Sequence, residues 1–494
     1  MQLTTDQCQR AARSHDPRFD GVFFIGVTST GIYCRPICPA RVSIASHRRF
    51  FISAAAAERF GYRPCLRCRP ELAPGRAPVD AVSRLAYAAT VRIGAGALNG
   101  RSVADLAREL GVSERHLRRA LEREVGVSPV ELAQTHRLLL AKRLLADSTL
   151  PVTQIAFASG FQSLRRFNTA FRERYRLSPT SLRRTEKSTR VRPGATAAVA
   201  APVQDVLRLT LAYRAPYAWN VLLGGLERDG LPGVERVEGG RYGRTLRIEG
   251  RSGAVFATDA AASSRGTHLD VEVSLSLLPA LMPLLARLRQ LFDLDAEPAV
   301  IDAQLEQGGL APFVARRPGL RIPGALDGFE IVLGSLIRGA GASGAAVREA
   351  LGRVVHELGE PIDSGLPGLD RLAPTAARVA EVGAEGLQAL GVAPRRARAL
   401  ATAAGAIAGG RLALDPGSDV VAAHRALLAI DGVGEHVATR IVMRSLYWPD
   451  AFPASDRALQ RAAGASGPGT LQARAESWRP WRAYAAQHLL LHAS

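Results

Sequence analysis

The spacing of hydrophobic positions changes several times along the chain. Between residues 79 and 185 apolar residues recur every three or four positions, which predicts amphipathic helices. From about 203 to 285 apolar and polar residues alternate, and the segments DVLRLTLAY, GRTLRIEG, AVFATDA and THLDVEVSL are typical of short strands. Two stretches there, WNVLLGGLERDG and LPALMPLLARLRQLF, favour helices. From about 290 to the end the helical period returns.

These changes predict a multidomain α+β protein, since 494 residues exceed what one hydrophobic core usually holds. The expected parts, in chain order, are a small cysteine-rich domain (1–78), an all-α double helix-turn-helix domain (79–185), a linker poor in large apolar residues (186–202), a small α+β domain (203–289) and an all-α domain (290–494).

The second region contains an internal repeat. GVSERHLRRALEREVGVSP is echoed by GFQSLRRFNTAFRERYRLSP, and Ser113 and Ser163 stand at equivalent positions 50 residues apart. In each copy a short helix should end at a glycine, Gly111 or Gly160, before a helix rich in arginine. Two helix-turn-helix units, each with a recognition helix, are predicted. The alternative is a plain helical bundle with a solvated basic face.

About 100 residues of this region resemble the AraC-type DNA-binding domain. The resemblance implies that the two basic helices enter the major groove. Glu114 opens the first of them. The DNA-contacting candidates are Arg115, Arg118, Arg119, Gln162, Arg165 and Arg166.

The chain is strongly basic, with 64 Lys and Arg against 45 Asp and Glu, a net charge of +19. Such a surface suits a polyanion, because each neutralised phosphate releases counterions. A genome rich in G and C, which favours arginine, is the alternative explanation. No apolar run approaches the ~20 residues of a membrane span, and the polar N-terminus lacks the apolar stretch of a secretory signal. We therefore expect a cytoplasmic protein with no membrane partner.

Four of the five cysteines form two tight pairs. Three residues separate Cys34 from Cys38, and two separate Cys65 from Cys68. Because disulfides are disfavoured in the cytoplasm, this spacing predicts a tetrahedral zinc site with four thiolate ligands rather than scattered reduced cysteines. Cys8 lies outside both pairs, and we expect no role for it in the zinc site.

Arginines surround these pairs. A zinc ion bound by four thiolates carries a net charge of about −2, so its sulfurs are nucleophilic unless they are shielded. The neighbouring Arg35, Arg41 and Arg67 could stabilise that charge or hold a DNA phosphate beside it.

The stretch STGIYCRPICPAR, with GYRPCLRC after it, resembles the N-terminal domain of the Ada family over about 70 residues. The resemblance implies that Cys34 irreversibly accepts a methyl group from a methylphosphotriester in DNA, with Cys38, Cys65 and Cys68 as the remaining zinc ligands. Its partners would be double-stranded DNA, both alkylated DNA and a promoter operator, with RNA polymerase as a further candidate. No cysteine follows Cys68, which excludes the second methyl acceptor of Ada proteins, the one for O6-methylguanine.

Near the C-terminus, the segment LLAIDGVGEHVATRIVMRSL predicts two helices joined by a tight turn at Gly432 and Gly434. Backbone N–H groups at such a turn bind phosphate without reading sequence, as in a helix-hairpin-helix. Asp456 follows Gly434 by 22 residues and should open a helix. Taken alone, Asp456 is most simply a helix N-cap.

From about residue 203 the chain resembles AlkA, the 3-methyladenine DNA glycosylase II family. The resemblance implies excision of a flipped-out alkylated purine, with Asp456 as the catalytic carboxylate. His436 occupies the place of the Schiff-base lysine of bifunctional relatives, which implies a glycosylase without lyase activity. His436 would belong to its base pocket. Tyr217 and Trp219 are candidate aromatic residues of that pocket, and the alternative is that both are core residues.

The pocket departs from the AlkA pattern. His436 and Leu490 stand where tryptophans are expected, and Gly339 stands where a glutamine flanks the base-wedging residue. These departures leave the base preference open. The leading hypothesis is a methyl-activated transcription regulator fused to an active glycosylase. The alternatives are a regulator whose inactive glycosylase domain serves as a DNA clamp, and a structural zinc protein that only binds DNA.

Overall fold

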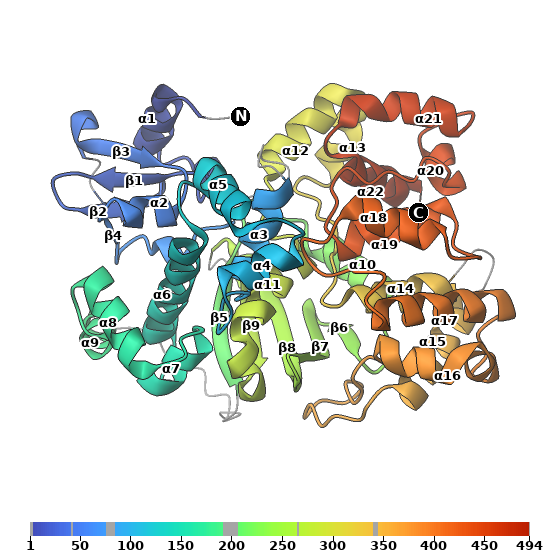
Figure 1. Cartoon of the computed structure of the whole chain (residues 1–494). Coiled ribbons are helices and arrows are strands. Elements are labelled where there is room, and N and C mark those ends of the chain that lie inside the picture. The colour runs from blue at the N-terminus through green and yellow to red at the C-terminus, as the bar shows by residue number, and fades with distance from the viewer. Residues whose placement is uncertain are drawn as a thin grey trace. The chain divides into compact units, whose positions relative to one another are not determined.

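The computed structural model describes residues 3–40, 43–75, 84–190, 206–263, 266–338 and 344–493. The chain divides into two compact units (Figure 1). The first comprises Met1–Arg76, Asp80–Arg214 and His268–Ala286. The second comprises Ala77–Val79, Ala215–Thr267 and Arg287–Ser494.

The first unit begins with a small mixed sheet of order β3-β1-β2-β4, next to two helices. Strands β1 and β2 pair antiparallel, as do β1 and β3, whereas β2 and β4 run parallel. The elements are α1 (Thr5–Ser14), β1 (Phe24–Val27), β2 (Ile32–Cys34), β3 (Arg48–Phe51), α2 (Ala54–Arg59) and β4 (Arg63–Pro64).

Seven helices follow, in the two copies that the repeat predicts. Gly111 and Gly160 take positive φ angles, 68° and 84°, just after the first helix of each copy. Ser113 and Ser163 cap the two basic helices, accepting hydrogen bonds from the backbone N–H groups of His116 and Arg166. The helices are α3 (Arg84–Gly94), α4 (Val103–Glu109), α5 (Glu114–Val125), α6 (Pro129–Asp147), α7 (Val152–Ala158), α8 (Leu164–Tyr175) and α9 (Pro179–Arg190). The predicted linker lies mostly outside the described residues, which end at Arg190 and resume at residue 206.

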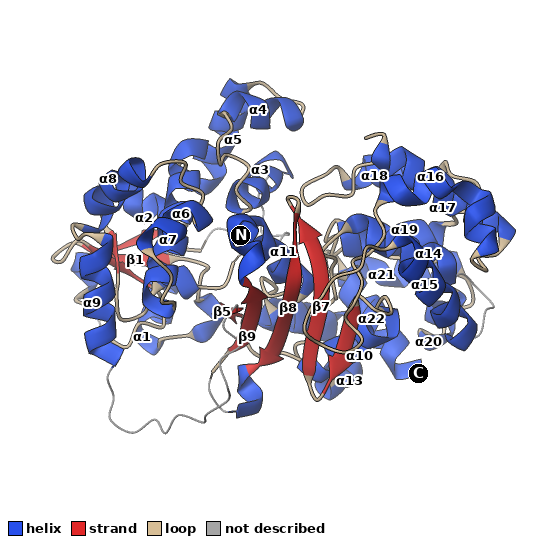
Figure 2. Ribbon diagram, turned by 90° about the horizontal axis from the view of Figure 1, so that it is seen from below, coloured by secondary structure: helices blue, strands red, loops and turns tan. Residues whose placement is uncertain are grey.

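A second sheet has the strand order β5-β9-β8-β7-β6 (Figure 2). All strand pairs with a defined register are antiparallel. The four strands expected from alternation are present, and β6 adds a short strand. The elements are β5 (Val206–Ala212), α10 (Trp219–Asp229), β6 (Glu235–Glu238), β7 (Arg241–Ile248), β8 (Arg251–Asp259), β9 (His268–Ser274) and α11 (Leu281–Leu291).

The rest of the second unit is helical, as the returning helical period predicts. One hydrophobic core lies among α14 to α19, and another among α12, α13 and α20 to α22. The helices are α12 (Pro298–Leu305), α13 (Ala311–Arg316), α14 (Gly328–Arg338), α15 (Gly344–Leu358), α16 (Ala376–Ala389), α17 (Pro394–Ala408), α18 (Val420–Leu428), α19 (Glu435–Ser445), α20 (Arg457–Ala462), α21 (Pro468–Ala475) and α22 (Arg482–Ala493).

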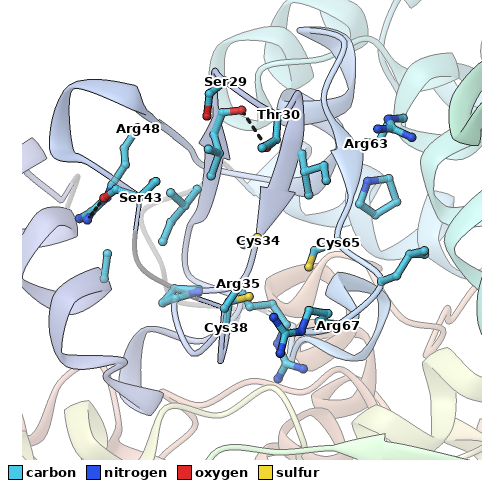
Figure 3. A pocket seen from close by; sticks show the side chains of 18 of the residues that line it. Ser29, Thr30, Cys34, Arg35, Cys38, Ser43, Arg48, Arg63, Cys65 and Arg67 are labelled. Carbon is cyan, nitrogen blue, oxygen red and sulfur yellow. Dashed lines mark hydrogen bonds between the residues drawn. The ribbon is translucent and has the colours of Figure 1, made fainter. Parts of the chain in front are cut away.

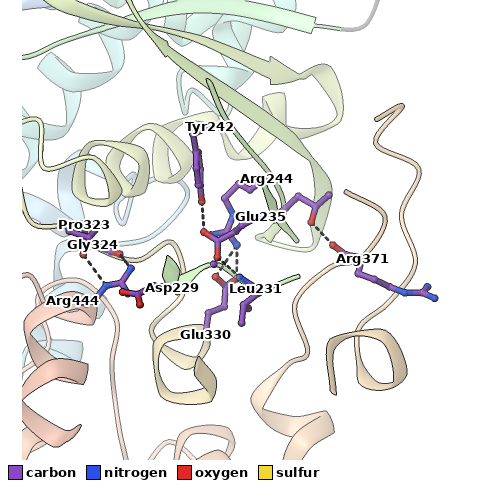
Figure 4. Close-up of polar contacts among 12 residues, drawn as sticks. Asp229, Leu231, Glu235, Tyr242, Arg244, Pro323, Gly324, Glu330, Arg371 and Arg444 are labelled. Atoms are coloured by element: carbon purple, nitrogen blue, oxygen red, sulfur yellow. Dashed lines mark hydrogen bonds and ion pairs between the residues drawn. The ribbon is translucent and has the colours of Figure 1, made fainter. Parts of the chain in front are cut away.

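A buried ion pair joins strand β7 to this helical part (Figure 4). Arg244, which is 1% exposed, donates from Nη2 to both carboxylate oxygens of Glu330 at 2.8 Å. Glu235 lies on the other side of the guanidinium and accepts a hydrogen bond from Tyr242. A buried charge is tolerated only when it is paired and hydrogen-bonded, so this pair fixes α14 against the sheet.

The predicted fold class, multidomain α+β, is confirmed. In the part of the chain that the structure describes, no helix combines the length and the apolar character needed to cross a bilayer.

Candidate functional site

The four paired cysteines come together at one edge of the first sheet. Because β2 and β4 run parallel, their carboxyl ends meet, and these ends carry Cys34 and Cys65. Each strand continues into a tight turn, closed by hydrogen bonds from Cys38 N–H to the carbonyl of Arg35 and from Arg69 N–H to the carbonyl of Cys65. All four sulfurs lie within 4.8 Å of one another.

This arrangement fits the predicted zinc site. Four sulfurs at about 2.3 Å from a tetrahedral zinc lie roughly 4 Å apart. Without a cation the four thiols cannot all ionise: contact with Cys38 raises the pKa of Cys34, whereas contact with Cys34 lowers the pKa of Cys65. A divalent cation removes this conflict, because every sulfur can then be a thiolate. The cluster is therefore suited to a zinc ion, and Cys34, Cys38, Cys65 and Cys68 stay its predicted ligands.

The four sulfurs differ in their access to solvent. Cys34 is half-buried, whereas Cys38, Cys65 and Cys68 are buried. Cys34 also lines a pocket of about 580 Å³, in which the side chains of Cys34, Cys38 and Cys65 gather (Figure 3). The backbone N–H of Arg35 donates to Sγ of Cys68 at 3.3 Å, and no described backbone N–H donates to Sγ of Cys34. Cys34 is thus the least buried residue of the four.

The arginines near the cluster differ in what they contact. Arg35 is bound inside the domain, since its guanidinium pairs with Asp20 and its Nη1 donates to the carbonyl of Cys68 at 3.1 Å. Arg67 is exposed at the pocket, near Cys38 in Figure 3. Arg41 lies outside the described residues.

The structure adds a contact that the sequence did not reveal. Glu58, whose side chain is fully buried, accepts hydrogen bonds from Tyr33, from Thr135 on α6 and from Arg174 on α8. Glu58 lies in AAAAER, a stretch with no hydrophobic period that would mark it as a core position.

A second buried pair lies beside Cys68. Glu71 accepts from Lys142 of α6 at 2.6 Å, and Arg69 pairs with both Glu71 and Asp147. Tyr33, next to Cys34, is therefore linked to α6 and α8 through Glu58. Arg69, next to Cys68, is linked to α6 directly through Asp147.

The predicted DNA-contacting residues lie on α5 and α8, except Gln162, which precedes the N-cap of α8. Arg115, Arg119, Gln162, Arg165 and Arg166 are exposed. Arg118 is half-buried and pairs with Glu114 one turn earlier. Arg115 and Arg119 also line a hollow of about 790 Å³ on α5. These helices thus present free cations to solvent, which a DNA backbone requires.

The hairpin between α18 and α19 has the geometry that the sequence predicts. Gly432 takes φ +88°, and a Cβ there would lie 3.3 Å from Cβ of Ala399. Gly434 is the N-cap of α19, so the first N–H groups of that helix have no partner within it. This is the backbone arrangement of a helix-hairpin-helix turn.

Asp456 and His436 lie together. Asp456 is the N-cap of α20, and its Oδ1 accepts hydrogen bonds from the N–H groups of Ala458 and Leu459, at 2.7 and 3.2 Å. Its other oxygen, Oδ2, lies 3.1 Å from Nδ1 of His436. The N-cap interpretation of Asp456 is confirmed, and it uses one carboxylate oxygen. The catalytic role of Asp456 stays a prediction.

Tyr217 and Trp219 have the contacts of core residues. Trp219 is buried, donates from Nε1 to the carbonyl of Gly240, and meets Phe292 edge to face. Tyr217 stacks on Trp219 and donates from its hydroxyl to the carbonyl of Phe292 at 2.8 Å. A place in the base pocket for either ring stays a prediction.

Of the two departures outside the hairpin, only one lies within the described residues. Leu490 is half-buried and packs against the core of α12, α13 and α20 to α22. Gly339 lies outside the described residues.

Three families of known domains match consecutive parts of the chain. The metal binding domain of Ada matches residues 7–71, a helix-turn-helix domain matches residues 106–185, and the AlkA N-terminal domain matches residues 208–327. These matches agree in order and position with the zinc cluster, the repeat and the second sheet.

Similar proteins cover the same parts. A protein of Mycobacterium tuberculosis described as a probable bifunctional transcriptional activator/DNA repair enzyme AlkA is 37% identical over 489 residues, 98% of this chain and 95% of that protein. DNA-3-methyladenine glycosylase 2 of Escherichia coli is 32% identical over 57% of this chain and 95% of that enzyme. The bifunctional transcriptional activator/DNA repair enzyme Ada of Escherichia coli is 31% identical over 31% of this chain and 42% of that protein.

The similarity to the Mycobacterium tuberculosis protein extends over nearly the whole of both chains, and three consecutive parts of this chain match domain families of their own. The chain therefore belongs to the family of bifunctional transcriptional activators and DNA repair enzymes that join an Ada-type metal-binding domain and a helix-turn-helix domain to an AlkA-type domain.

Proposed function

We propose that the protein senses DNA methylation at Cys34, activates transcription in response, and excises alkylated purines through a monofunctional glycosylase site at Asp456. The observation that supports the sensing function is the partial exposure of Cys34, because the other three cysteines of the cluster are buried. The relatives named as Ada and AlkA proteins support both activities.

The sensing step is a nucleophilic displacement at a methyl carbon. The Cys34 sulfur donates an electron pair to the methyl carbon of a phosphotriester, and the bond from that carbon to the phosphate oxygen breaks. The electron pair of the broken bond stays on the oxygen, which restores the phosphodiester anion. Zinc supplies the charge that keeps the sulfur deprotonated at neutral pH. The thioether product cannot easily lose its methyl group, so each molecule reacts once.

Methylation changes the charge of the cluster. A thiolate becomes an uncharged thioether, so the net charge of the zinc and its four ligands falls from about −2 to about −1. At close range to a DNA phosphate and at intermediate dielectric, one unit charge is worth a few kcal/mol. The methylated protein therefore binds its operator more tightly, through the exposed arginines of α5 and α8, with RNA polymerase as a candidate protein partner.

The excision step needs one carboxylate and little else. An N3- or N7-alkylated purine is already cationic and leaves readily once the sugar can carry positive charge. The Oδ2 oxygen of Asp456 stabilises that charge, while the hairpin at Gly432 and Gly434 holds a backbone phosphate. With His436 rather than a lysine after the hairpin, no Schiff base forms, and water completes the reaction.

The test is release of free 3-methyladenine or 7-methylguanine from methylated DNA. We expect release by the wild-type protein and none by Asp456→Asn, which keeps an N-cap oxygen while removing the negative charge. Absence of release by both would leave the alternative function, a regulator whose glycosylase domain is a DNA clamp. Because both proposed functions act on chromosomal DNA, we propose that the protein works in the cytoplasm of a bacterial cell.

A further inference from the structure

The two oxygens of Asp456 have different surroundings. Oδ1 is fully used by the two backbone N–H groups at the start of α20. Oδ2 accepts no described backbone hydrogen bond, and the polar atom placed against it is Nδ1 of His436, at 3.1 Å. Any chemistry by this carboxylate must use Oδ2, so His436 controls the oxygen that reacts.

The ring of His436 is buried on one side only. Nδ1 is buried and has no hydrogen bond of good geometry, although the side chain as a whole is 44% exposed. Catalytic hydrogen bonds are often poorly aligned before substrate binds and tighten in the complex. A carboxylate can only accept, so in the neutral ring the proton belongs on Nδ1, and the lone pair of Nε2 is at the opposite edge.

The charged groups around the ring keep it neutral. Burial lowers the pKa of His436, Asp456 at the start of α20 raises it, and Arg440 on α19 lowers it. On the neighbouring helix α18, His424 contacts Thr439 and Glu435. The net result is a pKa below the ordinary value of 6.5, so the ring is uncharged at pH 7.

We propose that His436 is a positioning residue for excision: its Nδ1–H orients Oδ2 of Asp456 toward the anomeric carbon of the flipped-out nucleotide, and its neutral ring admits a cationic purine. This inference rests on the proposed glycosylase function, and it names the residue that sets both the geometry of the carboxylate and the charge seen by the base.

Nδ1 of His436 keeps its proton throughout the reaction. The bond from C1′ to the base nitrogen breaks, and the base leaves with the electron pair as a neutral alkylpurine. The positive charge left on the sugar is stabilised by Oδ2. Water then forms a bond to C1′ and loses a proton, which Oδ2 accepts and passes to solvent.

Protonation of His436 would block this sequence in two ways. The imidazolium and the Asp456 carboxylate would together carry no net charge, so the sugar cation would lose its stabilisation. The ring would also place a positive charge beside a cationic base, which disfavours binding. Excision should therefore decline as the pH falls through the pKa of His436.

Two substitutions separate these roles. His436→Asn places an amide N–H near the position of Nδ1 but cannot titrate, whereas His436→Phe keeps a ring without a donor. Single-turnover release of 7-methylguanine from methylated DNA, with excess protein and corrected for non-enzymatic release, is measured from pH 5 to pH 8.5. The circular dichroism spectrum of each variant reports whether it is folded, and methyl transfer to Cys34 is a control for the first unit.

For the wild-type protein we expect an acidic limb in which the rate declines by about tenfold for each pH unit. His436→Asn should be less than about tenfold slower than wild type at pH 8 and should lack that limb. His436→Phe should be slower than wild type by tenfold or more at pH 8 and should likewise lack that limb.

An unchanged acidic limb in His436→Asn, or a wild-type rate in His436→Phe, would overturn the role of His436 while leaving the glycosylase function intact. Failure of the wild-type protein to release any base at any pH would overturn the glycosylase function itself, and this inference with it. The two failures are thus distinguishable in one experiment.

Discussion

The hydroxyl group of Tyr33 donates a 2.9 Å hydrogen bond to Oε1 of Glu58, and both groups are buried. Tyr33 directly precedes Cys34, the sulfur that we propose to accept a methyl group. The second oxygen of Glu58 accepts from Thr135 on α6 and from Arg174 on the second recognition helix, α8. The zinc domain and the helix-turn-helix repeat thus share one carboxylate in a single compact unit.

We predict that this carboxylate stabilises the first unit. Tyr33→Phe removes one of three hydrogen bonds and should lower the free energy of unfolding by about 1 kcal/mol. Glu58→Gln also leaves Arg174 without its negative partner and should cost about 1–3 kcal/mol. Urea unfolding followed by circular dichroism measures both.

The matched control for Tyr33 is Tyr62→Phe, which removes the hydroxyl of another buried tyrosine of the same sheet domain. No hydrogen bond of the Tyr62 hydroxyl is among those described, so this variant should unfold like the wild-type protein. Equal destabilisation by the two phenylalanine variants would contradict the importance of the Glu58 contact.

Sequence predicted the elements of the fold better than the contacts between them. The repeat placed Gly111 and Gly160 after short helices and Ser113 and Ser163 at the start of basic ones, and the structure confirms each, because caps depend on residues close in sequence. The buried Glu58 is paired with Arg174, which is 116 residues away, so no local sequence pattern predicts its burial.

In the candidate sites, too, the sequence predicted what depends on neighbouring residues and missed the contacts between distant ones. Spacing alone predicted the four-cysteine cluster, because the two cysteines of each pair lie in one tight turn. The sequence put His436 in the base pocket and Asp456 at a helix start, yet their 3.1 Å contact appears only when α19 and α20 are placed in space. The sequence predicted Arg35 as a cation available to the zinc cluster or to a DNA phosphate, whereas in the structure its guanidinium pairs with Asp20.

Cys34→Ser should abolish methyl transfer while leaving base excision unchanged, because Cys34 is the one cysteine of the cluster that is not fully buried. Mass spectrometry after incubation with DNA that contains methylphosphotriesters should detect one added methyl group in the wild-type protein and none in the variant. Methylated DNA should increase the operator affinity of the wild-type protein alone, by tenfold or more, since one unit charge is worth a few kcal/mol.

Cys8→Ser is the matched control, since Cys8 is buried in α1 and does not belong to the four-sulfur cluster. It should accept the methyl group like the wild-type protein and keep its zinc. Removal of zinc with a chelator should abolish methyl transfer in both, because the sulfur is then no longer held as a thiolate. Methyl transfer by the Cys34→Ser variant would place the acceptor elsewhere.

Arg119→Gln should weaken DNA binding in a salt-dependent way. Arg119 is exposed on α5, and no ion pair of its guanidinium is among those described. If it contacts a phosphate, the slope of log K against log salt should become smaller in magnitude by about 1. Arg123→Gln is the control on the same helix, because Arg123 is paired with Glu124 and should change the slope less. Equal slopes for Arg119→Gln and wild type would exclude a phosphate contact by Arg119.

Asp293 should make the second unit less stable as the pH rises. It is completely buried, accepts hydrogen bonds from Tyr447, Tyr484 and the backbone N–H of Ile322, and burial raises its pKa from 3.8 to about 6. Between these two values the folded protein keeps a proton that the unfolded chain has released, so the free energy of unfolding falls with rising pH. Above pH 6 the full cost, on the order of 3 kcal/mol, is present.

Asp293→Asn is the appropriate comparison, because asparagine cannot ionise and tolerates the positive φ angle of 51° at this position. The difference in unfolding free energy between wild type and variant, measured by urea unfolding from pH 4 to pH 7.5, isolates this group from all others that titrate. We expect the wild-type protein to lose stability relative to the variant as the pH rises from 4 to 6, and the difference to be constant above that. A difference that does not change with pH would mean that Asp293 is already ionised at pH 4, with its three hydrogen-bond donors outweighing the effect of burial.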